Sequence, residues 1–284
     1  CLDLFATAGA LRNAGDDEIL DRFTRAFAED RDIALKTLFF ARDIRGGLGE
    51  RRFFRVIFRY LAINYPDVAV KNIDNIAEYG RYDDILSLMD TACEQEAIAY
   101  IKAVLNDDMK SMQAQGLVSL MAKWLPSVNT SNKEAVRLAK KIAKGMDMSC
   151  ESYRKMLSSL RAYIRIIENN LREKDYSFEY NMQPSKALFK YRKAFIRNDG
   201  ERYQKFITDA RENPYELNTS TLTPYDIVGT VIKNRNGMPS EERAVLDTTW
   251  NALENYVNSD NTLVVVDGSG SMYWGGASVM PAAV

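Results

Sequence analysis

The sequence predicts a mainly α-helical protein in which a solenoid of paired helices is followed by the start of an α/β domain. Three observations lead to this fold class. Apolar residues recur at helical spacing over nearly all of the chain before Asn258, short breaks separate these segments, and one continuous apolar run, Leu263 to Val266, follows them. Recurring helix pairs without an intervening strand are typical of an α-solenoid. A compact helical bundle would give the same pattern, and the sequence leaves both arrangements open.

Amphipathic segments separated by short breaks recur between Asp16 and Leu171. The segment from Asp16 to Phe27 places its apolar residues on one helical face behind an acidic first turn. Similar spacing predicts further helices, of HEAT or armadillo type but irregular repeat length, over 33–40, 53–63, 68–77, 85–89, 97–105, 135–143 and 153–171.

From Tyr176 the composition of the sequence changes, and aromatic and polar residues predict loops. Pro184 opens another predicted helix, a later helix starts at Pro224, and a final one runs through Leu246, Trp250 and Leu253. Proline suits the first turn of a helix because the backbone N–H that it lacks would have no partner there.

The polar residues 258–261 predict a domain boundary. They separate a helical repeat domain over 1–257 from a second domain, of which 261–284 would be the amino-terminal part. A single apolar strand needs neighbouring strands for its backbone hydrogen bonds. Because only twelve residues follow Met272, and because Cys1 is not an initiator methionine, we expect the sequence to be part of a longer protein.

Composition indicates an ordinary globular protein of a reducing compartment. Apolar residues make up 46% and charged residues 27% of the chain. The chain has no run of eighteen apolar residues, the length that a membrane-spanning helix needs. The three cysteines are widely spaced and odd in number, which favours buried thiols over a disulfide framework. We therefore expect a cytoplasmic protein without a membrane partner.

The chain contains no histidine. This absence excludes imidazole-based zinc sites, the serine–histidine triad and the usual proton shuttle at neutral pH. Asp83 and Asp84 stand side by side at a predicted helix start, where capping explains them without chemistry. We predict that the protein is not an enzyme.

Basic residues concentrate in one region of a chain whose formal net charge is −1. Nineteen Lys or Arg stand against ten Asp or Glu between Lys133 and Arg211. This excess predicts a surface for a polyanion, although an ordinary solvated helix face is the alternative. The candidate RNA-binding residues, of which the first four are expected on related turns of one helix, are Arg154, Arg161, Arg165, Arg172, Lys186, Lys190, Arg192, Lys193 and Arg197.

Aromatic residues are interleaved with the later cations of this region. Because cations hold phosphates and aromatic rings stack unpaired bases, the combination favours RNA as the polyanion. The rings are Phe189, Tyr191, Phe195 and Tyr203.

The stretch 42–55, RDIRGGLGERRFFR, holds five arginines around two glycine turns. A Walker phosphate loop is disfavoured because the Gly-Lys-Ser/Thr sequence is absent and no strand precedes the stretch. Two interpretations remain. The stretch is a turn between helices, with a helix C-cap at Gly46 and arginines paired to Asp43 and Glu50, or it contacts an RNA backbone.

The run from Thr262 to Met272, TLVVVDGSGSM, places an acid and two serines in a glycine-bearing turn after the apolar strand. Alternation points the oxygens of Asp267, Ser269 and Ser271 to one side. Such hard oxygen ligands suit magnesium, manganese or calcium. A simple Gly/Ser turn, or serines that only cap a helix, would share this sequence.

This run resembles the metal-ion-dependent adhesion site of von Willebrand factor A domains, whose pattern is Asp-x-Ser-x-Ser. The resemblance implies the start of a doubly wound α/β domain. It further implies that Asp267 holds a divalent cation, Mg²⁺ before Mn²⁺ or Ca²⁺, directly or through a water, and that the hydroxyls of Ser269 and Ser271 ligate it. In that family, a threonine and an aspartate from later loops complete the site.

Six motifs occur in the same order in a domain-of-unknown-function family that looks like a relative of the TROVE module of Ro and of telomerase- or vault-associated ribonucleoproteins. This resemblance implies an arc of HEAT-like helices closed by a von Willebrand A domain, and it implies an RNA-binding scaffold for structured or single-stranded RNA. The alternative is a metal-dependent adaptor that binds a protein partner through the ion and binds no RNA. The motifs are ARDIRGGLGERRFFRVIFRYL, EYGRYDDILSL, KWLPS, YRKMLSSLR, MQPSKAL and VVVDGSGSM.

Overall fold

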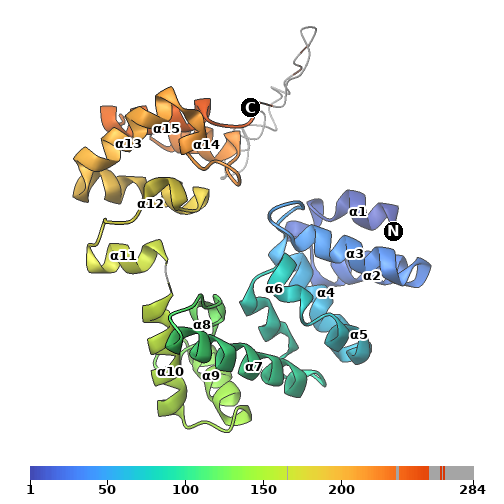
Figure 1. The fold of residues 1–284 in the computed structure, drawn as a ribbon. Helices are drawn as coiled ribbons and strands as arrows, with labels where there is room; N and C mark the ends of the chain where they lie inside the picture. Colours follow the sequence, from blue (N-terminus) through green and yellow to red (C-terminus); the bar gives the residue numbers. More distant parts are fainter. Residues whose placement is uncertain (165, 235–236, 256–262, 264, 266–284) are drawn as a thin grey trace. The chain divides into compact units, whose positions relative to one another are not determined.

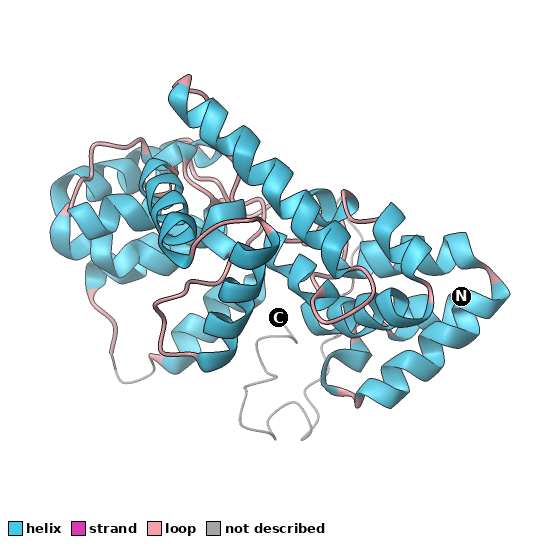
Figure 2. Cartoon of the chain, turned by 90° about the horizontal axis from the view of Figure 1, so that it is seen from below, coloured by secondary structure: helices cyan, strands magenta, loops and turns pink. Residues whose placement is uncertain are grey.

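The computed structural model describes residues 1–164, 166–234, 237–255, 263 and 265. This part of the protein is mainly helical and contains no β-strand, which confirms the predicted helical class (Figure 2). Nearly all of the second domain predicted over 261–284 lies outside the described residues. None of the described helices combines the length and the apolar composition that crossing a membrane requires.

The chain divides into two compact units between Arg165 and Ile166. The elements of the first unit follow the colour bar of Figure 1 from blue to green, and η marks a 3₁₀ helix. In chain order they are α1 (Leu2–Thr7), η1 (Ala10–Asn13), α2 (Asp16–Glu29), α3 (Arg31–Arg42), α4 (Arg51–Asn64), α5 (Pro66–Lys71), α6 (Asn75–Tyr79), η2 (Tyr82–Leu88), α7 (Glu94–Gln113), α8 (Met121–Trp124), α9 (Lys133–Gly145) and α10 (Cys150–Tyr163).

Helices α2, α3 and α4 pack against one another and hold the aromatic core of the first unit. Apolar residues stand three or four positions apart on these helices, so packing removes one face of each from water. Phe54 and Phe58 are fully buried, with ring centroids 5.0 Å apart. The helices predicted over 16–27, 33–40 and 53–63 are confirmed, each slightly longer than its apolar stripe.

Two predicted helices are interrupted. Segment 68–77 divides into α5 and α6, because the Asn72 carboxamide donates to the Val68 carbonyl oxygen at 2.8 Å, a local bond that competes with helix continuation. Segment 153–171 divides into α10 and α11, and Ile164 leaves the helical region with φ −57° and ψ 122°. Three of the four residues at 164–167 are isoleucines, whose β-branched side chains favour helix weakly.

The glycine-rich connection after α3 is an interhelical turn. The C-cap of α3 is Asp43 and not Gly46. The Asp43 carboxylate accepts hydrogen bonds from the backbone N–H groups of Arg45 at 2.9 Å and of Gly46 at 3.1 Å. Glu50 pairs with Arg12. The predicted pairing of nearby arginine side chains with Asp43 and Glu50 is therefore wrong, because backbone donors and a distant arginine reach these carboxylates instead.

A cluster of two aspartates and three arginines joins α3, α4 and η2 in the first unit. Asp84 is fully buried, and its carboxylate accepts hydrogen bonds from Arg42 Nε at 2.7 Å, from Arg55 Nε at 2.6 Å and from the Arg81 backbone N–H at 3.0 Å. Asp83 forms ion pairs with Arg55, at 2.7 Å, and with Arg81. A buried carboxylate needs this number of donors to offset its loss of hydration.

The second unit continues the helical pattern, coloured yellow to red in Figure 1. Its α12 begins at Ser185 and its α14 at Pro224, as the two prolines predict. The elements are α11 (Ile167–Glu173), η3 (Tyr180–Met182), α12 (Ser185–Asn198), α13 (Gly200–Glu212), η4 (Pro214–Glu216), α14 (Pro224–Lys233) and α15 (Ser240–Asn251).

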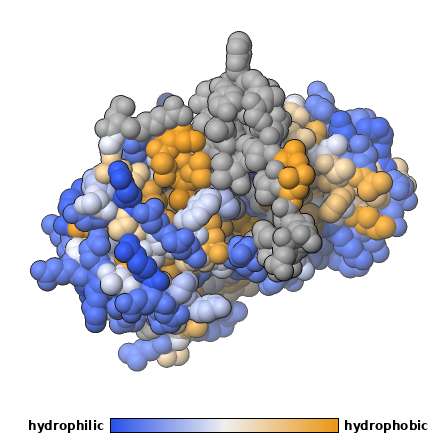
Figure 3. All heavy atoms as spheres, turned by 90° about the horizontal axis from the view of Figure 1, so that it is seen from above, coloured by the Kyte–Doolittle hydropathy of each residue, from blue (hydrophilic) through white to orange (hydrophobic). Residues whose placement is uncertain are grey.

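Aromatic rings form the core of the second unit. Tyr180, Phe195 and Tyr203 lie with their ring centroids 5.0 to 5.2 Å apart, between α12, α13 and the loop that precedes them. The Tyr180 hydroxyl donates to Asp199 Oδ2 at 2.7 Å, which satisfies its polar end. Hydrophilic residues cover most of the surface in the view of Figure 3, with hydrophobic residues in separate patches.

Candidate nucleic-acid interface

Four basic residues form a stripe along one face of α12. Lys186, Lys190, Lys193 and Arg197 are spaced by four, three and four positions, and all four are exposed. Because a helix turns once in 3.6 residues and rises 1.5 Å per residue, these side chains share one face over about 17 Å. We refer to these four residues as the basic stripe.

The opposite face of α12 is buried, and it includes one cation that the sequence placed with the others. Leu188 and Phe195 pack in the core, and Arg192 stands between them on the same face. The Arg192 guanidinium donates to Glu242 Oε1 at 2.8 and 3.2 Å and to the Phe189 carbonyl oxygen at 2.6 Å. Arg192 therefore links α12 to α15 and does not face the solvent with the basic stripe.

The members of the basic stripe differ in how far protein carboxylates neutralise them. Lys186 Nζ lies 2.6 Å from Asp226 Oδ2, and Lys193 Nζ lies 3.3 Å from Glu242 Oε2. Lys190 lies over the ring of Tyr191, 4.7 Å from the centroid, and Arg197 forms no ion pair with a described residue. A hydrogen bond that the Lys190 ammonium donates to the Tyr191 hydroxyl raises the pKa of Lys190 above its ordinary value.

The charges around α12 do not balance. Five cations project from the helix, counting Arg192, and within the described part of the chain the carboxylates that interact with them are Glu168, Asp226 and Glu242. The excess of positive charge lies on the exposed face, since the buried cation is matched by a buried acid. An extended positive face of this kind attracts a polyanion.

Only two of the predicted stacking rings lie near this surface. Phe189 and Tyr191 are half-buried beside the basic stripe. Phe195 is fully buried and Tyr203 is 2% exposed, so the prediction that they stack bases is wrong. Their rings fill the core because they stand on the apolar faces of α12 and α13.

The remaining candidate residues do not join the basic stripe on one helix. Arg154 is exposed on α10, and Arg172 is exposed on α11 beside Glu173. Arg161 is half-buried, and its guanidinium donates to the carbonyl oxygens of Ala122 and Leu125 at the end of α8. These residues belong to two units because the predicted single helix is broken. Arg165 lies outside the described residues.

The predicted ion site also lies outside the described residues. Asp267, Ser269 and Ser271 belong to the part of the sequence that follows residue 265. Among the residues that are described, no group of three or more Cys, Asp or Glu side chains is arranged to hold a metal ion. The ion site therefore stays a prediction from the sequence motif.

Comparison with known proteins gives a viral relative. "Uncharacterized protein L728" of Acanthamoeba polyphaga mimivirus is 26% identical over 313 aligned residues, which cover 96% of this chain and 54% of the relative. The chain thus spans about half the length of the relative that it matches. No solved structure matches the chain.

A family model matches almost the whole chain. The model is described as "Domain of unknown function (DUF2828)", and its matches cover residues 1–115 and 96–263, from α1 through the last described helix. The matched residues include the arginine–aspartate cluster of the first unit and the basic stripe of the second. The chain belongs to the DUF2828 family.

Proposed function

We propose that the protein is an RNA-binding scaffold of the ribonucleoprotein type, and that the basic stripe on α12 is part of its RNA-binding surface. The observation that supports this proposal most directly is the alignment of four exposed cations on one helix face, with buried Glu242 matched by Arg192 on the other side. Helix periodicity and core packing together fix the direction of the stripe.

Binding in this proposal works through phosphate contacts. Neither Lys190 nor Arg197 forms an ion pair with a described residue, so phosphates meet their charges without first breaking such a pair. Phe189 and Tyr191 offer half-buried rings beside the stripe for an unpaired base. Contacts of this kind give affinity and orientation with little sequence preference.

We further propose that the helices form a HEAT-like arc related to the TROVE module, followed by a von Willebrand A domain. The order of the six sequence motifs, the pairing of helices such as α2 with α3, and the run D-G-S-G-S support this arrangement. Asp267, Ser269 and Ser271 would hold a divalent cation, with Mg²⁺ the first expectation. An ion site of that kind also supports the alternative function, a metal-dependent adaptor that binds a partner's carboxylate.

The test compares two quadruple variants in RNA binding. Substitution of the basic stripe, K186Q/K190Q/K193Q/R197Q, removes four positive charges from α12. The matched control, K102Q/K110Q/K140Q/K144Q, removes four from α7 and α9. Fluorescence anisotropy with a labelled RNA hairpin that carries a single-stranded 3′ tail gives the dissociation constants at 50 mM salt.

We expect the stripe variant to bind at least about tenfold more weakly than the wild type, and the control to bind within about threefold of it. Equal losses in both variants would show that only net charge matters. The absence of RNA binding by the wild type at 50 mM salt would leave the adaptor as the better proposal.

A further inference from the structure

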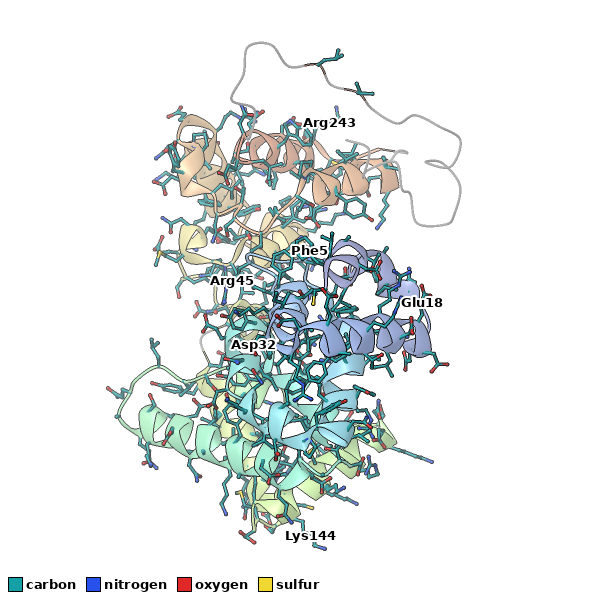
Figure 4. The ribbon with its side chains drawn as sticks, turned by 90° about the vertical axis from the view of Figure 1, so that its right-hand side faces the viewer. Phe5, Glu18, Asp32, Arg45, Lys144 and Arg243 are labelled. Atoms are coloured by element: carbon teal, nitrogen blue, oxygen red, sulfur yellow. The ribbon has the colours of Figure 1, made fainter. Side chains whose placement is uncertain are left out.

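A groove of about 680 Å³ lies in the first unit, between α3 on one side and α5 and α6 on the other. Its volume is in the range of small-molecule sites, which is roughly 300–1,000 Å³. Apolar and polar side chains line it in similar measure. Asp32, labelled in Figure 4, belongs to the lining at the start of α3.

An aromatic ring is available in the groove. Tyr79 at the end of α6 packs against Phe39, with ring centroids 5.7 Å apart, yet 41% of the residue stays exposed. Packing holds the ring while part of it faces the solvent. A partly exposed ring with restricted motion is a platform on which a nucleobase stacks.

Three cations line the groove without an acidic partner. Arg31, Lys36 and Lys71 are exposed, and none of them forms an ion pair with a described residue. The Arg31 guanidinium lies 5.3 Å from the ring centroid of Phe27 and 5.8 Å from that of Tyr65, so the aromatic rings position it.

The acids of the groove are stabilised by their own backbone surroundings. The Asp43 carboxylate accepts two backbone N–H groups of the following turn, as described above. Asp32 lies in the first turn of α3, where the partial positive charge of the helix amino terminus favours a carboxylate. The lysines thus keep their charge available for an anion from outside.

An oriented carboxamide completes the groove. Asn72 Nδ2 donates to the Val68 carbonyl oxygen at 2.8 Å, and Asn75 Nδ2 donates to Asn72 Oδ1 at 2.9 Å. This chain of bonds fixes the Asn75 side chain and leaves its Oδ1 and its second N–H without a partner among the described residues. A free amide donor and acceptor side by side match the edge of a nucleobase.

We propose that this groove binds a nucleotide, with the base stacked on Tyr79 and contacted by Asn75 and with the phosphate held by Lys36 and Lys71. The nucleotide is either a free nucleoside monophosphate or an unpaired residue of an RNA strand. An acidic peptide would meet the same cations, but it would make no use of the ring and the carboxamide. The site lies in the first unit and does not depend on the basic stripe of α12.

Isothermal titration of the full chain with three probes tests the proposal: AMP, adenosine and the tetranucleotide r(AAAA). AMP binds, and adenosine binds several-fold more weakly because it lacks the phosphate. Tyr79→Ala weakens AMP binding by about fivefold or more, the range of one base–aromatic stack. K36Q/K71Q weakens AMP binding but leaves adenosine binding unchanged.

Matched controls are Tyr215→Ala, at a tyrosine that is 97% exposed, and Lys144→Gln on α9, and both bind AMP like the wild type.

Binding of r(AAAA) at least about tenfold tighter than AMP identifies an RNA strand as the source, and equal or weaker binding identifies a free nucleotide. The proposal is overturned if neither AMP nor r(AAAA) binds at millimolar concentration, if the Tyr79 and the lysine variants both bind AMP like the wild type, or if a glutamate-rich peptide binds where AMP does not. The stripe variant K186Q/K190Q/K193Q/R197Q keeps wild-type AMP binding, so failure of the proposed RNA surface and failure of this groove are distinguishable. The lysine variants change exposed residues, so their effect is measured on a folded chain.

Discussion

Arg42 and Asp84 are 42 residues apart in the sequence and form a buried ion pair, with Arg42 Nε 2.7 Å from Asp84 Oδ2. The pair connects the motif that begins with ARDIRGG to the motif GRYDDIL, so two of the most distinctive stretches of the sequence meet at one point of the first unit. Arg55 approaches the other carboxylate oxygen at 2.6 Å. A structural role thus accounts for Arg42 and Arg55, two of the six arginines of the first motif.

Removal of the Asp84 charge should destabilise the first unit strongly. In Asp84→Asn, Arg42 stays buried without its acid, which costs on the order of 3–5 kcal/mol. The free energy of unfolding of the first unit is measured by urea titration, with hydrogen exchange of the α3 and α4 amides as the probe. Asp147→Asn is the control, because Asp147 is 85% exposed beside Lys102 and should cost no more than about 1 kcal/mol. Similar losses in both variants would contradict a special role for Asp84.

The pair Arg192–Glu242 gives a second prediction, for the other unit. Glu242→Gln leaves the buried guanidinium without a full charge partner, so we expect a loss of about 3 kcal/mol in the stability of the second unit. The double variant R192M/E242M should be more stable than Glu242→Gln, because an apolar pair of similar size has no charge to solvate. Hydrogen exchange of the α12 amides provides the measurement, and a double variant less stable than the single one would refute the argument.

The stability of the first unit should fall in acid. Burial alone would raise the pKa of Asp83, but hydrogen bonds from Arg81 and Arg55 outweigh it and hold the pKa below its ordinary value. A carboxylate whose pKa is lower in the folded state stabilises the fold above its unfolded pKa, roughly 3.9, and loses this contribution as the pH falls through the folded pKa. Asp83→Asn should therefore flatten the fall in unfolding free energy between about pH 5 and pH 2. If the unfolding free energy of Asp83→Asn fell with pH as steeply as that of the wild type, the proposed contribution of Asp83 would be wrong.

Divalent cations should stabilise the protein through the D-G-S-G-S run. We expect the melting temperature of the full chain to rise with added MgCl₂, because a ligand that binds the folded state alone stabilises it by mass action. Asp267→Ala and Ser269→Ala should abolish the rise, whereas Asp260→Ala, a nearby acid outside the motif, should keep it. A rise that survives Asp267→Ala would place the cation elsewhere.

Arg197→Gln should change the salt dependence of RNA binding. Each phosphate that a single strand loses from contact lowers the slope of log affinity against log salt by about 0.7. Arg197 forms no ion pair with a described residue, so its substitution should reduce the slope by roughly this amount and weaken all RNA sequences alike. Lys144→Gln on α9 is the control, and the prediction fails if both variants shift the slope equally.

The sequence predicted most of the helices because a regular apolar stripe leaves little choice of buried face. The helical spacing of the apolar residues also shows which side of α12 Arg192 lies on, although the charge pattern groups Arg192 with the exposed cations. Arg192 follows Leu188 by four positions and precedes Phe195 by three, which assigns it to the buried side of α12. Phe195 belongs to the same buried side, so its position in the core could be predicted from its spacing to Leu188.

The partners of Asp83 and Asp84 were beyond such reasoning. Capping explained the two acids locally, and the Asp84 carboxylate does accept the Arg81 backbone N–H at 3.0 Å. The arginines that complete the cluster come from α3 and α4, and no local pattern links them to η2. The groove between α3, α5 and α6, for which we propose a nucleotide, was not predictable for a similar reason, since Lys36, Lys71 and Tyr79 stand on three different helices.

Glu242 interacts with two adjacent residues of α12 that point to different sides: Arg192 inward and Lys193 outward. If a phosphate bound Lys193 as proposed, Arg192 would still neutralise Glu242, so no unpaired negative charge would remain in the interior. The surface lysine can therefore change partners without loosening the helix that carries it.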